Sequence, residues 1–139
     1  MSVDDAIYSR LSGNSAVRAI VDDRIYPDRT PQDTALPKIV FTTISQGRAP
    51  NTSGASGVTN PRIQIDCWAD SNAGAFALAD AVRLALDGYR GTVASVVIRS
   101  CFLDSERKAI VEPRDGGEQR IYGRSLDFNI WHLETVPTF

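Results

Sequence analysis

The hydrophobic pattern is clearest between Ile63 and Ala69, where two kinds of side chain alternate along the chain. One parity is apolar and the other is polar or carries a large ring: Ile63, Ile65, Cys67 and Ala69 against Gln64, Asp66 and Trp68. A period of two residues is typical of a β-strand with one face on a core. We therefore predict a strand here, with Trp68 on the face that turns away from the core.

The next stretch has helical spacing and follows this strand directly. Ser71 can cap a helix by accepting a hydrogen bond from a free backbone N–H, and Gly88 can take the left-handed conformation that ends one. The residues expected to face the core are Ala75, Leu78, Ala79, Val82, Ala85 and Leu86. Phe76 falls in the opposite, polar sector, where its ring needs cover from the N-terminal helices or from another subunit.

Two short helices are predicted before this region. Apolar residues recur every four positions from Val3 to Leu11 behind a Ser2 cap, and Asn14 can cap a second helix. The segment from Arg24 to Pro27 is then a brief extended piece. The polar, proline-containing segment from Asp28 to Pro37 is expected to be a loop.

Three further strands are predicted from apolar and β-branched runs. The segment Lys38 to Gln46 is apolar on both parities, which is typical of a central strand. Both faces of the segment Thr92 to Leu103 are again largely apolar. The last strand runs from Gln119 to His132. Its apolar residues change parity around Gly123, which predicts a bulge at that glycine.

Two long polar segments separate these strands. Gly47 to Asn60 contains glycines and small hydroxyl residues with almost no apolar side chains, so it cannot offset the entropy of its own ordering by burial. We predict a long, mobile hairpin tip there. Asp104 to Gly117 alternates charge signs and is predicted to be an exposed connection, with a short strand around Ile110 and Val111.

Together these elements predict an α+β fold in a single domain, residues 1–139. The expected architecture is a mainly antiparallel four-stranded sheet with one long helix and two short N-terminal helices on one face. The other face of the sheet is then uncovered, and by parity Trp68 and Trp131 both lie on it. Large rings on an open face usually meet a partner.

Composition excludes some partners. The chain has 139 residues, 42% hydrophobic residues and a formal net charge of −2, so it has no bulk attraction for nucleic acid or an anionic membrane. Cys67 and Cys101 lie in separate predicted strands without metal-binding spacing, which favours buried thiols in a reducing compartment. The acidic N-terminus and the lack of a long apolar run predict a protein that is soluble and intracellular when made.

The sequence offers no catalytic or metal-binding constellation. His132 is the one histidine, and the motifs of the common hydrolases, phosphate-binding loops, dinucleotide-binding folds and zinc proteases are missing. The clustered acids are neighboured by basic residues, as in solvated loops. We therefore expect neither an enzyme nor a cofactor.

Two runs of the chain resemble the tail completion, or tail terminator, proteins of long-tailed bacteriophages, the lambda-like group included. The first run is RIYPDRTPQDTALPKIVFTTIS, from Arg24 to Ser45, and the second is IQIDCWADSNAGAFALADAVRLAL, from Ile63 to Leu86. The matching features are structural: the Arg24 to Pro27 segment, the Leu36-Pro37 pair, the Gln64 to Asp66 strand core and the Ala/Leu-rich helix.

The resemblance implies a small structural subunit that forms a hexameric ring. Such a ring caps the tail tube, stops its polymerisation and presents the surface that joins the head. The implied partners are the tail tube protein and a head-completion or connector protein, with DNA only passing through the ring and no membrane. The implied location is the host cytoplasm during assembly and then the virion tail.

Residue chemistry adds candidate contacts and leaves alternatives open. Phe76, Trp68, Trp131 and Arg48 are the candidate interface residues, because aromatic and arginine side chains most often anchor interfaces. Another phage neck or minor tail protein would fit the same features. So would a small dimeric α+β enzyme or ligand-binding domain that associates through the open sheet face.

Overall fold

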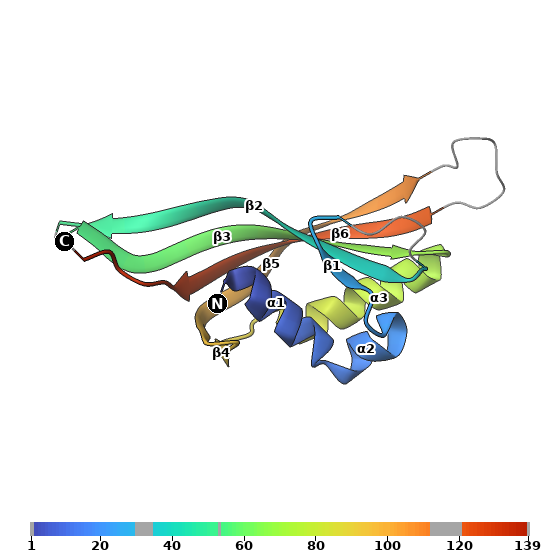
Figure 1. Ribbon diagram of the computed structural model, residues 1–139. Coiled ribbons are helices and arrows are strands. Elements are labelled where there is room, and N and C mark those ends of the chain that lie inside the picture. The colour runs from blue at the N-terminus through green and yellow to red at the C-terminus, as the bar shows by residue number, and fades with distance from the viewer. Residues whose placement is uncertain (1, 30–34, 53, 112–120, 139) are drawn as a thin grey trace.

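The computed structural model describes residues 2–29, 35–52, 54–111 and 121–138 (Figure 1). Within these residues, three helices and six strands follow one another: α1 (Val3–Ser12), α2 (Ser15–Val21), β1 (Ile25–Pro27), β2 (Lys38–Asn51), β3 (Gly54–Ala69), α3 (Asn72–Leu86), β4 (Gly91–Val93), β5 (Val96–Val111) and β6 (Ile121–Leu133). The helices lie on one face of a curled sheet (Figure 1). We call this the helix face, and the opposite one the outer face.

The sheet corrects the predicted fold class. It has six strands rather than four, in the order β1-β2-β3-β6-β5-β4, and it is mixed because β1 runs parallel to β2. The longest helix, α3, has only 15 residues. The predicted architecture of a four-stranded, mainly antiparallel sheet with one long helix is therefore wrong.

Backbone geometry explains the extra strands. The predicted strand from Thr92 to Leu103 is divided by a tight turn at Ala94 and Ser95, whose φ angles are 49° and 64°. Glycine and asparagine usually occupy such positions, so the turn has no signature in the sequence. The β1 strand pairs over only three residues, too few for a periodic pattern.

Helix boundaries follow the predicted caps. The Ser2 side chain accepts from the Asp5 backbone N–H in a capping box, and the Asn14 side chain accepts from Val17. In α3 the Ser71 hydroxyl accepts from the Gly74 N–H at 3.0 Å. The six α3 residues predicted to face the core are all buried: Ala75, Leu78, Ala79, Val82, Ala85 and Leu86. The alternation from Ile63 to Ala69 is also confirmed, because its apolar parity is buried in β3.

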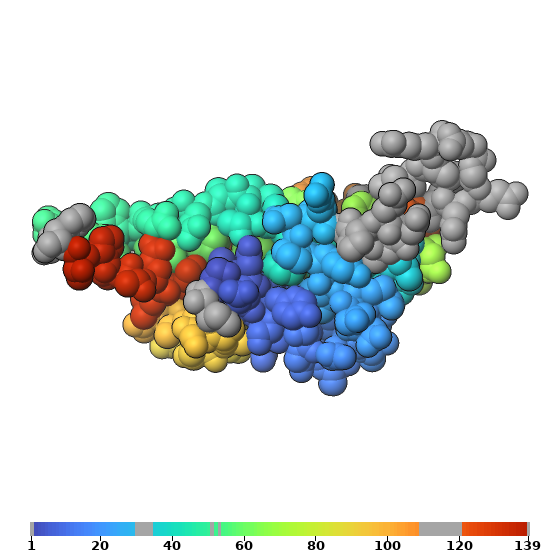
Figure 2. All heavy atoms as spheres, viewed as in Figure 1, coloured from blue at the N-terminus to red at the C-terminus, as the bar shows by residue number. Residues whose placement is uncertain are grey.

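The segment predicted as a mobile hairpin tip is instead paired strand. Gly47 lies opposite Asn60 and Arg48 opposite Thr59, and pairing continues to Asn51 and Gly54. We call residues 44–62 the hairpin arm. It extends beyond the helices, with the C-terminal segment beside it (Figures 1 and 2).

Hydrogen bonds order the hairpin arm where apolar burial does not. The fully buried Thr59 hydroxyl donates to the Gly47 carbonyl at 3.0 Å and accepts from the Gln46 amide at 3.1 Å. The Glu134 N–H donates to the Gly57 carbonyl at 2.8 Å, which ties the C-terminal segment to β3. Composition gives the apolar content of a segment but not its hydrogen-bond partners. For this reason it predicted a mobile segment where the chain is ordered.

Two further expectations at the other end of the sheet are corrected. Strand β5 continues through residues 104–111 and pairs with β6 up to Val111 opposite Ile121, so the predicted exposed connection is strand in this part. The short strand predicted around Ile110 and Val111 is confirmed as the end of β5. Residues 112–120 lie outside the described residues. The register shifts of the β5–β6 pair fall at Arg99 and Asp104, and the predicted bulge at Gly123 is absent from the described pairing.

Candidate interaction surfaces

A belt of charged and polar side chains crosses the middle of the outer face. Asp127 of β6 lies at its centre and accepts hydrogen bonds from three residues of the neighbouring strands. Arg107 donates at 2.8 Å, the Ser105 hydroxyl at 3.1 Å and Arg62 at 3.4 Å. Arg62 also pairs with Asp104 at 2.6 Å. The belt thus ties β3, β6 and β5 together across the face.

These donors stabilise the negative charge of the Asp127 carboxylate. Burial alone raises the pKa of this carboxyl, but the hydrogen bonds from Arg107 and Ser105 and the charges of Arg107 and Arg62 outweigh burial, so its pKa is lowered. The carboxylate form is therefore the one that the fold stabilises. Because its charge is already neutralised within the chain, this belt is a structural feature of the sheet.

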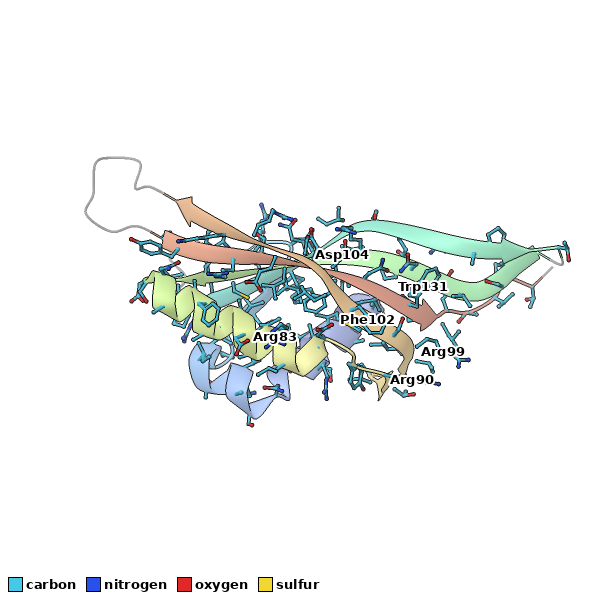
Figure 3. All side chains as sticks on the ribbon, turned by 180° about the vertical axis from the view of Figure 1, so that it is seen from behind. Arg83, Arg90, Arg99, Phe102, Asp104 and Trp131 are labelled. Atoms are coloured by element: carbon cyan, nitrogen blue, oxygen red, sulfur yellow. The ribbon has the colours of Figure 1, made fainter. Side chains whose placement is uncertain are left out.

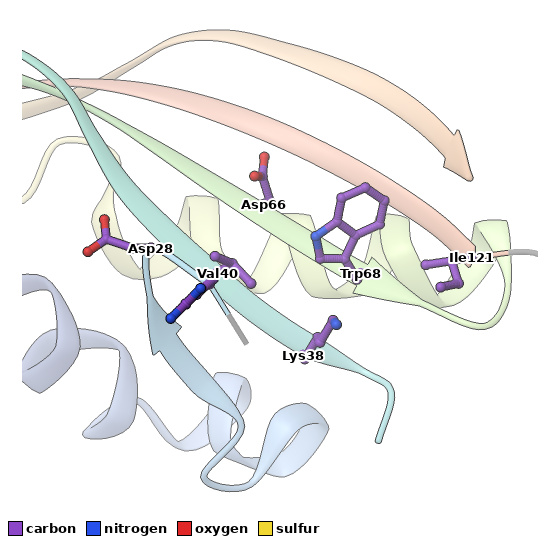
Figure 4. Close-up of a pocket in the computed structure, with 7 residues that line it drawn as sticks. Asp28, Lys38, Val40, Asp66, Trp68 and Ile121 are labelled. Atoms are coloured by element: carbon purple, nitrogen blue, oxygen red, sulfur yellow. The ribbon is translucent and has the colours of Figure 1, made fainter. Parts of the chain in front are cut away.

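Trp68 lies on the outer face beside a hollow of about 340 Å³ (Figure 4). The hollow is lined by residues of β2, β3, β6 and the segment after β1, among them Asp28, Lys38, Val40, Asp66, Trp68 and Ile121. The mixture of an indole ring, aliphatic side chains and charges of both signs suits a protein side chain as occupant.

Gly123 makes room for the Trp68 ring. The two residues are paired across β3 and β6, and a Cβ atom on Gly123 would lie 2.5 Å from the ring. The glycine at this position therefore allows the Trp68 ring to pack against β6. The sequence predicted a different role for it, a bulge in the last strand.

Trp131 forms part of a second apolar patch at the other end of the outer face. Phe102 of β5 pairs with Asn129, so its ring is a diagonal neighbour of Trp131 on β6. Phe102 is 56% exposed and Trp131 is 38% exposed. Arg99 and Arg90 lie at the same end of the molecule (Figure 3). We call these two rings the Phe102–Trp131 patch.

Phe76 lies on α3, on the opposite side of the sheet from Trp68. Its ring is 54% exposed, and it is covered in part by the Arg124 guanidinium, 5.1 Å from the ring centre. Arg124 is itself held by Glu106 at 2.8 Å. The cover comes from β6, whereas the sequence suggested the N-terminal helices or another subunit.

Arg48 lies on the hairpin arm and has a partner within the chain. Its guanidinium contacts the Glu134 carboxylate at 2.6 Å. This hydrogen bond is the main cause that lowers the pKa of Glu134. Arg48 is thus part of the contact between the arm and the C-terminal segment, and it is not at the start of a free loop.

The four candidate residues are spread over the molecule. Trp68 and Trp131 share the outer face, but their β6 positions are eight residues apart, which is about 26 Å along a strand. Phe76 and Arg48 lie elsewhere. Sequence reasoning missed Phe102, because both parities of its strand looked apolar and neither could be assigned to the outer face.

Side chains with metal-binding or thiol chemistry are scattered or buried in the described part of the chain. No three histidine, cysteine or acidic side chains among them are placed to hold a metal ion. Cys67 and Cys101 are free and buried, and burial raises both thiol pKa values, that of Cys101 to about 12. Within the same residues no helix is long and apolar enough to cross a membrane.

Comparison with known proteins identifies the family. The family model described as tail completion protein gp17 matches residues 5–133. A search of curated proteins found no match. Among solved structures, a chain from the virion of a native gene transfer agent (GTA) particle has the same fold, with a TM-score of 0.72 and 19% identity over 93% of this chain and 92% of that one. The chain therefore belongs to the tail completion protein gp17 family and is a structural protein of phage-type tails.

Proposed function

We propose that this protein forms a closed homo-hexameric ring on the finished tail tube. The ring stops tube polymerisation and presents the surface to which the head-completion or connector protein binds, while DNA passes through its centre. The subunit assembles in the host cytoplasm and remains in the virion tail. Membership of the tail completion family supports the tail role. The number six rests on the sequence resemblance.

The observation that carries the proposal is the Phe102–Trp131 patch. Two exposed aromatic rings at diagonal positions, with Arg99 and Arg90 at the same end of the molecule, have the composition of an interface anchor. The Trp68 hollow lies at the other end of the same face. Two different surfaces at separated positions suit a heterologous contact, in which one surface meets a different surface of the neighbour and repetition closes a ring.

Phe76, Trp68, Trp131 and Arg48 remain the proposed contact residues, and Phe102 joins them. Truncating a true anchor costs about 2 kcal/mol or more at an interface. Native mass spectrometry across a concentration series would give the oligomeric state of wild type and of the Trp131→Ala, Phe102→Ala, Trp68→Ala and Phe76→Ala variants. Tyr8→Ala is the matched control, because Tyr8 is an exposed ring on α1, on the opposite side of the sheet from Trp68, Trp131 and Phe102 (Figure 1).

We expect hexamers for wild type and Tyr8→Ala, and smaller species for the anchor variants. A strictly dimeric wild type would overturn the ring. If wild type is monomeric alone, the same variants are compared for binding to purified tail tubes. Termination is tested by electron microscopy of tails assembled without the protein, which should be overlong. Tails of normal length would contradict the terminator role.

A further inference from the structure

Strand β5 has a long open edge on the side away from β6. There it pairs with β4 over three residues only, and the segment after α3 occupies the next positions. The Gly88 N–H donates to the Cys101 carbonyl at 2.6 Å. The Leu103 N–H donates to the Asp87 carboxylate at 2.9 Å. Among the described strands none pairs with residues 104–111 on this side, so the backbone groups that point there are open to a further strand.

The register assigns one N–H group to this open edge. The Leu103 N–H points away from β6, since it reaches Asp87. Backbone directions alternate along a strand, and the register shift between Leu103 and Ser105 adds one extra residue. The Lys108 N–H therefore also points to the open side, where the fold itself does not use it.

Strand β2 has a second open edge, on the opposite side of the sheet. Strand β1 pairs with it only up to Phe41, whose carbonyl accepts from the Asp28 N–H at 2.9 Å. No described strand pairs with residues 44–51 on this side. A register shift again adds one residue after Phe41, so the Gln46 N–H points outward. Its partner in β3 is Pro61, which has no N–H to donate, as expected for that direction.

An exposed apolar side chain lies beside each open edge. Phe76 of α3 is 5.1 Å from the Arg124 guanidinium, and Arg124 is paired with Glu106. The half-exposed Phe76 ring therefore lies near the open stretch of β5, which contains Glu106. Ile44 is 53% exposed and begins the open stretch of β2. A contact between the two edges would bury apolar surface in addition to forming backbone hydrogen bonds.

We propose that the open edge of β5 pairs with the open edge of β2 in a second copy of this chain, so that the sheets of neighbouring subunits join head to tail. The proposal rests on the ring described under the proposed function. The two open stretches each span eight residues and lie at opposite ends of the sheet (Figure 1). A second copy is the occupant because pairing of unlike edges covers both stretches in every subunit of a closed ring, whereas pairing of like edges leaves one uncovered.

Proline substitutions test this pairing. Lys108→Pro and Gln46→Pro each remove an outward N–H, and proline is tolerated where a strand faces solvent. Lys108→Ala and Gln46→Ala are the matched controls, because they lose the same side chain and keep the N–H. Circular dichroism checks that all four variants fold. Native mass spectrometry across a concentration series should show self-association weakened about tenfold or more in each proline variant relative to its alanine control.

A mixture of the two proline variants identifies which edges meet. Each variant keeps one intact open edge, so head-to-tail pairing predicts a one-to-one heterodimer in the mixture and nothing larger. If like edges pair instead, Gln46→Pro alone will dimerise through β5 and mixing will add nothing, which contradicts the proposal.

Two other outcomes would overturn the edge pairing and leave the ring itself standing. One is a wild type that stays monomeric throughout the concentration series, since a ring that forms only on the tube is tested separately by tail length. The other is ring formation by folded proline variants as readily as by their alanine controls. If the proline variants do not fold, hydrogen exchange of wild type decides. Amides of residues 104–111 should exchange more slowly in the assembled protein than in the monomer, and unchanged exchange rejects the pairing.

Discussion

At the residue scale, the contact between Gly123 and Trp68 shows how one small residue sets the shape of a surface. Because Gly123 has no side chain, the indole ring lies over the β6 backbone and borders the outer-face hollow. The sequence correctly placed Trp68 on the face away from the core. It did not reveal the role of the glycine, because the partner of Gly123 across the sheet is Trp68 of β3, which lies 55 positions earlier in the chain.

Gly123→Ala should destabilise the fold and displace the indole. The added Cβ would meet the Trp68 ring at 2.5 Å, so we expect a loss of about 1 to 3 kcal/mol and a changed tryptophan emission maximum. Gly47→Ala is the control, because the nearest atom to its added Cβ is 3.7 Å away. Urea unfolding followed by fluorescence measures both. Equal stabilities of the two variants would show that the ring moves at no cost.

Asp127→Asn should make stability less dependent on pH. The folded-state pKa of Asp127 is lowered below its unfolded value, so the carboxylate stabilises the fold above the unfolded pKa and this contribution is lost as pH falls through the folded pKa. We expect the variant to lose about 1 to 3 kcal/mol at pH 7, and progressively less as the pH falls through the folded-state pKa of Asp127. Melting temperatures of both proteins between pH 7 and pH 2.5 test this. A constant difference would mean that other groups carry the dependence.

At the element scale, the sequence correctly predicted the elements that are defined by hydrophobic periodicity and by helix caps. The helix after Ser71 and the β3 alternation are present because burial and caps act within a few residues. Elements that rest on distant partners were missed. The hairpin arm is ordered by the hydroxyl of Thr59 and by the C-terminal segment, and neither appears in local composition. The same reason hid the belt around Asp127, whose members come from three strands.

The hairpin arm should be protected from hydrogen exchange in the isolated protein. Its backbone pairs Gly47 with Asn60 and Arg48 with Thr59, so amides that bond within this pairing should exchange more slowly than in an unfolded peptide of the same sequence. Mass spectrometry of the 44–62 region measures this. Thr59→Val removes the buried hydroxyl that serves Gly47 and Gln46 and should speed exchange in the arm.

Arg48→Ala serves as the comparison for Thr59→Val, because the exposed Arg48–Glu134 ion pair is expected to contribute only about 0 to 1 kcal/mol. Immediate, complete exchange of the wild-type arm would restore the mobile loop that composition suggested.

At the scale of the whole molecule, two long hairpins are joined at the centre of one sheet. Strands β2 and β3 form the first hairpin and β5 and β6 form the ribbon beside it, and β3 pairs with β6 along the middle. The three helices then cover one face, which leaves the other for partners (Figure 1). Cys67 lies in the first hairpin and Cys101 in the second, and both are buried.

Both thiols should therefore be unreactive until the sheet opens. Burial raises their pKa values, so at pH 8 each is protonated and shielded in the folded protein. We expect slow labelling by a thiol reagent in buffer and rapid labelling in denaturing urea. If the sheet opens as one unit, the Cys67→Ala and Cys101→Ala variants should label their remaining thiol at similar rates. Strongly different rates would show that one hairpin detaches alone.

The central pairing of β3 with β6 also has a consequence for the time the chain needs to fold. Each hairpin joins strands that are near in sequence, whereas Ile63 and Phe128 are paired across roughly sixty intervening residues. Bringing these two strands together costs loop-closure entropy before their contacts can offset it. In sheet proteins this cost slows folding to milliseconds or longer. We expect each hairpin to form first, and the pairing of β3 with β6 to form afterwards. Pulse-labelled hydrogen exchange during refolding would show β3 and β6 protected last along their shared edge, and simultaneous protection of all strands would contradict this order.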